Sequence, residues 1–136
     1  MTSKILYLGD LRTSCEHLQS GNIIITDAPT DNHGKGEAFS PTDLVATSLG
    51  SCMISIMAIK SKDLEVDLKN TAINVTKVMQ SEPRKISKII VEFHIPVDPI
   101  EKNKVILERA AMTCPVLLSL NPDIEKEVRF NWNSTI

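Results

Sequence analysis

The stretch SPTDLVATSLGSCMISIMAIK, residues 40–60, carries the pattern that decides the fold. Ser40 is suited to cap a helix, Pro41 suits the first helical position, and Asp43 completes a capping box. No charged residue occurs from position 44 to position 59. The side of the helix that carries Cys52 and the opposite side are both apolar or small: Val45, Leu49, Ile56 and Ile59 on one, and Ala46, Gly50, Ile54 and Met57 on the other. A helix that is apolar all round is typically buried, and a length of about 30 Å matches the width of a small domain.

Short apolar segments precede this helix. Residues 4–8 and 12–18 are predicted to form strands around the turn at Gly9-Asp10, and residues 22–26 form a third strand after the turn at Ser20-Gly21. The three strands together predict an antiparallel meander. Residues 27–39 are rich in Asp, Pro, Asn and Gly, and they form the loop that leads into the helix.

The segments after the helix alternate between apolar and polar residues. Residues 64–80 and 85–97 are predicted to form a hairpin with one buried face, interrupted at residues 81–84. A second helix begins at Asp98-Pro99, and Pro115 interrupts it, which leaves a short helical segment at 116–120. Residues 127–132 form the last strand. The element order βββ-α-ββ-αα-β predicts an α+β fold in which a long buried central helix packs on antiparallel sheets.

The size of the chain sets its organisation. A length of 136 residues predicts a single domain that spans residues 1–136. A helix that is apolar all round is hard to bury in a monomer with so few other helices. This difficulty favours a homodimer in which the long helices meet.

The composition excludes several classes of protein. A net charge of −2 and an aromatic content of 4% give no basis for binding nucleic acid. The N-terminal apolar run is too short for a signal peptide, which predicts a cytoplasmic protein. The serines and threonines within residues 41–60 favour a core helix over a membrane span. Three cysteines in a cytoplasmic chain are expected to be free, catalytic or metal-bound rather than a disulfide framework.

Cys52 lies in the middle of the long helix, where two interpretations are open. A free cysteine is often a small buried hydrophobic residue. A reactive thiol at this place would lie too far along the helix for activation by the N-terminal dipole, and apolar burial would raise its pKa. A functional Cys52 therefore requires a cation from elsewhere in the fold. Arg12 on an early strand is one source, and the others are Arg84, Arg109 and Arg129.

Two further cysteines have different surroundings. Cys114 lies between Thr113 and Pro115, at the predicted start of the short helical segment, where the helix dipole favours a thiolate. The alternative is a core residue at a helix kink. Cys15 lies two residues from His17 on a predicted strand, but the other histidines have no ligand-like spacing, so no metal site is expected.

Two runs of sequence resemble those of a known family. The run GEAFSPTDLVATSLGSCM at residues 36–53, followed by AAMTCPV at residues 110–116, resembles the OsmC/Ohr family of osmotically inducible and organic hydroperoxide resistance proteins. The predicted element order is similar to that of the family over nearly the whole chain. The resemblance implies an intertwined homodimer that acts as a cysteine-based peroxidase on organic hydroperoxides.

The resemblance also implies roles for three residues. Cys52 matches the peroxidatic thiolate, which attacks the peroxide and becomes a sulfenic acid. Cys114 matches the resolving cysteine, which forms a disulfide that an external dithiol then reduces, with no cofactor. Arg12 matches the arginine that stabilises the thiolate.

One position departs from the family pattern. In the hydroperoxide resistance branch, the proline at the helix start is followed by a glutamate that orients the arginine, and this chain has Thr42 there. Asp43 is half a turn away from Cys52 around the helix, so capping is its expected role. Glu16 and Glu37 remain as alternative partners for the arginine. The missing glutamate leaves open two alternatives: a non-enzymatic dimer that binds a small apolar ligand between its chains, and a redox sensor that changes its binding to a partner.

Overall fold

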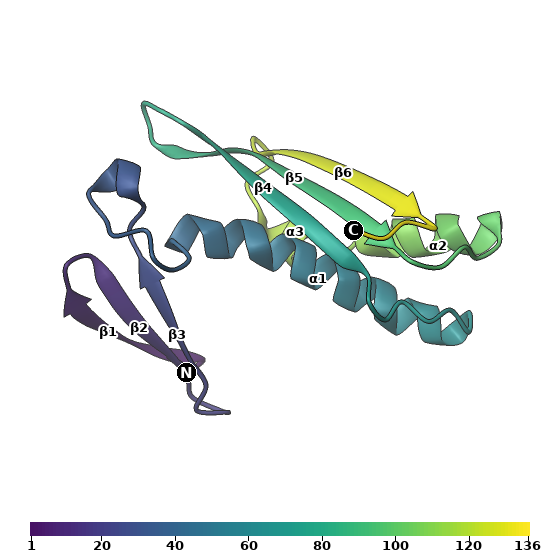
Figure 1. The fold of residues 1–136 in the computed structure, drawn as a ribbon, viewed down its shortest axis with the longest axis horizontal. Helices are drawn as coiled ribbons and strands as arrows, with labels where there is room; N and C mark the ends of the chain where they lie inside the picture. Colours follow the sequence, from purple (N-terminus) through teal and green to yellow (C-terminus); the bar gives the residue numbers. More distant parts are fainter. The chain divides into compact units, whose positions relative to one another are not determined.

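The computed structural model describes residues 1–136 as two compact units, Met1–Val45 and Ala46–Ile136 (Figure 1). The chain contains β1 (Ser3–Gly9), β2 (Arg12–His17), β3 (Ile23–Asp27), the short 3-10 helix η1 (Thr30–Asn32) and α1 (Pro41–Asp63). It continues with β4 (Ala72–Gln80), β5 (Lys85–Ile95), α2 (Glu101–Ala111), α3 (Pro115–Ser119) and β6 (Glu125–Trp132). The predicted element order and the α+β class are confirmed.

The first unit contains an antiparallel sheet in the order β1-β2-β3. Asp10 and Leu11 both have positive φ, at 53° and 62°, and form the tight turn between β1 and β2. The apolar residues of this sheet are largely exposed: Ile5, Leu6, Tyr7, Leu8, Ile23, Ile24 and Ile25. An apolar surface of this extent is typical of an interaction site.

The capping box at the start of α1 forms as predicted. The Ser40 hydroxyl accepts the Asp43 N–H at 3.1 Å, and the Asp43 carboxylate accepts the Ser40 N–H at 2.9 Å. These two bonds satisfy backbone donors that a helix start leaves unpaired. The sequence therefore determines where α1 begins.

Replacing Ser40 by alanine is expected to lower the free energy of unfolding by about 0.5–2 kcal/mol, because the Asp43 N–H loses its acceptor. Chemical denaturation at fixed protein concentration measures the change. Ser55→Ala in the same helix is the matched control, since the Ser55 hydroxyl is exposed and bonds only to the Ser51 carbonyl. Its expected effect is within about 0.5 kcal/mol. Equal effects of the two substitutions would contradict a capping role for Ser40.

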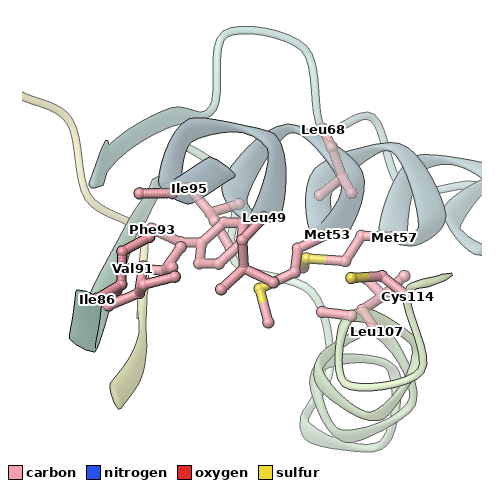
Figure 2. Packing of buried hydrophobic residues seen from close by; sticks show 13 residues of the cluster. Leu49, Met53, Met57, Leu68, Ile86, Val91, Phe93, Ile95, Leu107 and Cys114 are labelled. Carbon is pink, nitrogen blue, oxygen red and sulfur yellow. The ribbon is translucent and has the colours of Figure 1, made fainter. Parts of the chain in front are cut away.

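In the second unit, helices cover one face of the sheet formed by β4, β5 and β6 (Figure 1). Alternate residues of β5 point into the core, and all four are fully buried: Ile89, Val91, Phe93 and Ile95. They pack with Leu49, Met53 and Met57 of α1 and with Leu107 of α2 (Figure 2). Phe93 also stacks on Phe130 of β6, with ring centroids 4.9 Å apart.

The burial of α1 differs from the prediction of a helix enclosed all round. One face is buried, at Ala46, Leu49, Gly50, Met53 and Met57. Val45 is 40% exposed and Ile59 is 65% exposed, because one sheet and two short helices cover a single side of a long helix. By length and hydropathy alone α1 could cross a membrane, but its buried face packs on the strands of the second unit.

Three boundaries or pairings also differ from the prediction. The first half of the segment 64–80 is not a strand, because Glu65 and Asn70 adopt left-handed conformations with φ of 54° and 69°. α2 begins at Glu101, three residues after Asp98. β6 pairs with β5 in parallel rather than antiparallel orientation, since the chain passes through α2 and α3 between the two strands and returns in the same direction.

Candidate functional site

Cys114 lies at the junction of α2 and α3 and caps α3. Its backbone is extended, with φ of −64° and ψ of 143°, and Pro115 occupies the first helical position. The Cys114 sulfur accepts the Leu117 N–H at 3.3 Å. The side chain is fully buried, and Figure 2 shows it within the group formed by Met53, Met57 and Leu107. The predicted place of this cysteine at the start of the short helix is confirmed.

The thiol of Cys52 packs against the buried cluster that contains Cys114, and the two thiols interact electrostatically. Burial raises the pKa of the Cys114 thiol above its usual value, the Cys52 thiol raises it further, and the Leu117 N–H opposes both effects. Cys114 is therefore a protonated thiol at neutral pH, and the prediction that the helix start favours its thiolate is wrong, because the effect of burial exceeds that of the backbone N–H. Cys52 is only half-buried, so it is the member of the pair that a solute can reach. Both are free thiols, and the fold brings together two cysteines that are 62 positions apart.

Arg12 begins β2 in the first unit, where Asp27 stands opposite it on β3. The guanidinium binds the carboxylate through two bonds, Nε to Oδ1 at 2.7 Å and Nη2 to Oδ2 at 2.8 Å. Nη2 also donates to Glu37 Oε2 at 3.3 Å. This contact confirms Glu37 as a partner of Arg12, whereas Glu16 stands opposite Lys4 and Ile23.

Asp27 is the residue of this cluster that sequence reasoning missed. Its side chain is fully buried, and besides Arg12 it accepts the Glu37 N–H at 3.1 Å. The guanidinium of Arg12, against the opposing effect of burial, holds the pKa of Asp27 below its usual range, and the pKa of Arg12 is raised in turn. The register of the β2–β3 hairpin could have predicted this partner. Counting residues away from the turn at 18–22 along both strands places Asp27 opposite Arg12.

The lowered pKa of Asp27 predicts a loss of stability in acid. A carboxylate with a depressed folded-state pKa contributes stability above its unfolded value of 3.8, and this contribution is lost as the pH falls through the lower folded-state pKa. Denaturation curves between pH 6 and about pH 2 measure this dependence. The acid-induced loss is expected to be smaller in Asp27→Asn than in the wild type, because asparagine does not titrate. Parallel acid profiles for the two proteins would contradict the prediction.

The three other arginines lie in the second unit. Arg129 on β6 bonds to Glu127, and strand alternation places it on the face opposite the core residues Val128 and Phe130. Arg109 is exposed in the last turn of α2, and Arg84 is exposed in the turn between β4 and β5. A cation that stabilises a half-buried thiolate would itself be partly buried, and these exposed arginines do not fit that role.

Cys15 lies on β2, with its sulfur 3.5 Å from the Thr13 hydroxyl. It lines a pocket of about 310 Å³ in the first unit, together with Ile5, His17, Ile24 and Leu44. No group of three His, Cys, Asp or Glu side chains is arranged as metal ligands.

Comparisons with known proteins connect this geometry to a family. The sequence model described as OsmC-like protein matches residues 34–129, a range that includes parts of both units. The crystal structure of a protein of Psychrobacter arcticus, named as a candidate osmotic stress induced and detoxification response protein, is 52% identical. The match covers 96% of this chain and 96% of that chain, with a TM-score of 0.93.

More distant structures share the fold. An organic hydroperoxide resistance protein OsmC of Legionella pneumophila is 15% identical over 96% of this chain and 97% of that chain, with a TM-score of 0.75. An OsmC-like protein of Mycoplasma pneumoniae is 15% identical over 96% of this chain and 93% of that chain, also with a TM-score of 0.75. No match is found among curated proteins. From the family match over most of its length, and from the two thiols that its fold brings together, the chain belongs to the OsmC-like family.

Proposed function

We propose that this protein is a thiol-dependent peroxidase that reduces organic hydroperoxides, with Cys52 as the peroxidatic and Cys114 as the resolving cysteine. The proximity of a half-buried thiol to a fully buried one, with Cys52 packed against the cluster that contains Cys114, is the observation that carries the proposal. Structural relatives named as organic hydroperoxide resistance proteins support the same reaction class.

The reaction has three balanced steps. The Cys52 thiolate attacks the outer oxygen of the hydroperoxide, which breaks the O–O bond; with one proton taken up, the products are a Cys52 sulfenic acid and an alcohol. The Cys114 thiol then attacks the sulfenic sulfur, and water leaves as the Cys52–Cys114 disulfide forms. An external dithiol reduces this disulfide and is itself oxidised to a disulfide.

The difference between the two thiols fits this order of events. Cys114 is protonated and buried, so it is a poor first nucleophile, and it already lies near the sulfur on which the sulfenic acid forms. Cys52 needs a cation to become a thiolate, and we assign Arg12 to that role. The Arg12 bonds to Asp27 and Glu37 use Nε and Nη2, so the two N–H groups of Nη1 are not used by these carboxylates.

The working form in this proposal is a homodimer. The exposed apolar residues of the β1–β2–β3 sheet and of α1, such as Tyr7 and Ile59, supply an apolar surface for a second copy of the chain. Light scattering on the purified protein is expected to give twice the mass of the chain. A monomer at micromolar concentration would contradict this part of the proposal.

The direct test is to mix reduced protein with cumene hydroperoxide and dithiothreitol and to follow peroxide consumption. Mass spectrometry of the protein after peroxide alone is expected to show the loss of two hydrogen atoms and a peptide linkage between Cys52 and Cys114. Peroxide consumption no faster than with dithiothreitol alone would overturn the proposal. If apolar ligands then raise the melting temperature of both the wild type and Cys52→Ser, the protein is a ligand-binding member of the family.

A further inference from the structure

The resemblance leaves one position without its expected residue. Thr42 stands where the hydroperoxide resistance branch has an arginine-orienting glutamate, and the Thr42 hydroxyl lies 3.2 Å from the Ser40 hydroxyl at the helix start. A threonine cannot bind a guanidinium through two oxygens. We infer that Asp27, on the strand beside Arg12, is the positioning residue that orients this arginine. The inference rests on the proposed function, because it concerns the arginine that the proposal assigns to the Cys52 thiolate.

Both oxygens of Asp27 take part in holding Arg12. Oδ1 accepts Nε at 2.7 Å and Oδ2 accepts Nη2 at 2.8 Å, so two parallel bonds fix the plane of the guanidinium as well as its place. Such a fork requires a carboxylate, because an asparagine amide would present an N–H group to a guanidinium that can only donate.

Asp27 is itself held firmly. Its side chain is fully buried, Oδ2 accepts the Glu37 N–H at 3.1 Å, and its own N–H donates to the Phe39 carbonyl at 3.1 Å. The register of β2 and β3 sets Asp27 directly opposite Arg12. A buried, hydrogen-bonded carboxylate on a paired strand has few alternative positions, so it holds the guanidinium in one orientation.

Glu37 has a different relation to the same arginine. Its side chain is 67% exposed, and it makes a single contact with Nη2 at 3.3 Å. An exposed single contact does not fix a plane, and water and salt screen its charge. The positioning role therefore falls mainly on Asp27, and Glu37 contributes less.

Four variants of the full-length protein test the inference: Asp27→Asn, Glu37→Gln, Arg12→Lys and Glu16→Gln. For each, the alkylation rate of Cys52 by iodoacetamide is measured against pH, in parallel with peroxide turnover and the melting temperature. Asp27→Asn is expected to move the midpoint of the alkylation profile upward by about one pH unit and to lower kcat/KM at neutral pH about tenfold, since one unit in the thiol pKa is tenfold in thiolate fraction. Arg12→Lys keeps the charge but loses the fork, so it is expected to behave similarly.

The remaining variants set the scale of the effect. Glu37→Gln is expected to shift the profile by less than Asp27→Asn. Glu16→Gln is the matched control on β2, and it is expected to leave the profile unchanged because Glu16 stands opposite Lys4 and Ile23 rather than opposite Asp27.

Several results would overturn the inference. One is an unchanged Cys52 profile in Asp27→Asn; another is a loss of turnover without a shift of the profile, which indicates a structural role alone. Equal shifts in Asp27→Asn and Glu37→Gln would also overturn it. If Asp27→Asn does not fold, Arg12→Lys tests the inference instead. A Cys52 alkylation profile in Arg12→Lys that equals the wild type would show that the two parallel bonds to Asp27 do not orient the arginine. Absence of peroxide turnover by the wild type would defeat the peroxidase proposal. The alkylation profiles would still test whether Asp27 positions Arg12.

Discussion

Replacing Cys52 by serine is expected to abolish dithiol-dependent hydroperoxide consumption, with a fall in kcat/KM of about a thousandfold or more. A serine hydroxyl has no thiolate form at neutral pH, and it cannot form a sulfenic acid or a disulfide. The side chain is half-buried on α1 and packs against the cluster that contains Cys114, and serine is close to cysteine in size, so the substitution changes little of the packing. Stopped-flow or coupled assays of peroxide consumption measure the change.

Cys15→Ser is the matched control for this substitution. Cys15 lies on β2 in the first unit and bonds to the Thr13 hydroxyl, and no step of the proposed reaction uses it. Turnover by Cys15→Ser is therefore expected to match the wild type. Equal activity of Cys52→Ser and the wild type would show that the peroxidase reaction does not use this thiol.

Replacing Phe93 by alanine is expected to give the largest loss of stability, about 3–5 kcal/mol in the free energy of unfolding. Phe93 is fully buried near the C-terminal end of β5, and its ring stacks on Phe130 with an interplanar angle of 18°. Alanine would remove the apolar area and the stacked pair and would leave a cavity between the sheet and α1. Urea denaturation at fixed protein concentration measures the loss.

Val78→Ala on β4 is the control for this substitution. Its side chain is 39% exposed, so the expected cost is about 1 kcal/mol or less, mainly from strand propensity. A cost for Phe93→Ala as small as that for Val78→Ala would mean that the core of the second unit does not depend on the β5 face.

The sequence predicts best where local chemistry acts alone. The capping box of Ser40 and Asp43, the break at Pro115 and the place of Cys114 all depend on residues within a few positions of one another, and the structure confirms each. The alternation of residues 85–97 likewise predicts the buried face of β5, because period two is a direct property of a strand.

The sequence predicts less well where distant segments decide. Residues 64–71 alternate well enough to resemble a strand, but left-handed Glu65 and Asn70 turn the chain before β4 begins. The parallel partner of β5 depends on the path through α2 and α3, which no local pattern contains. The Asp, Pro, Asn and Gly content of residues 27–39 predicts a loop that includes Asp27, whereas its place on β3 and its bond to Arg12 depend on a strand register.

The bond from the Leu117 N–H to the Cys114 sulfur decides how the resolving thiol must be studied. An alanine at this position would remove a reactive group and a helix cap in one change, so a lost activity could come from either. A serine hydroxyl can still accept that N–H, since serine is among the preferred capping residues. Only the serine variant therefore separates the redox chemistry of this sulfur from its role as the cap of α3.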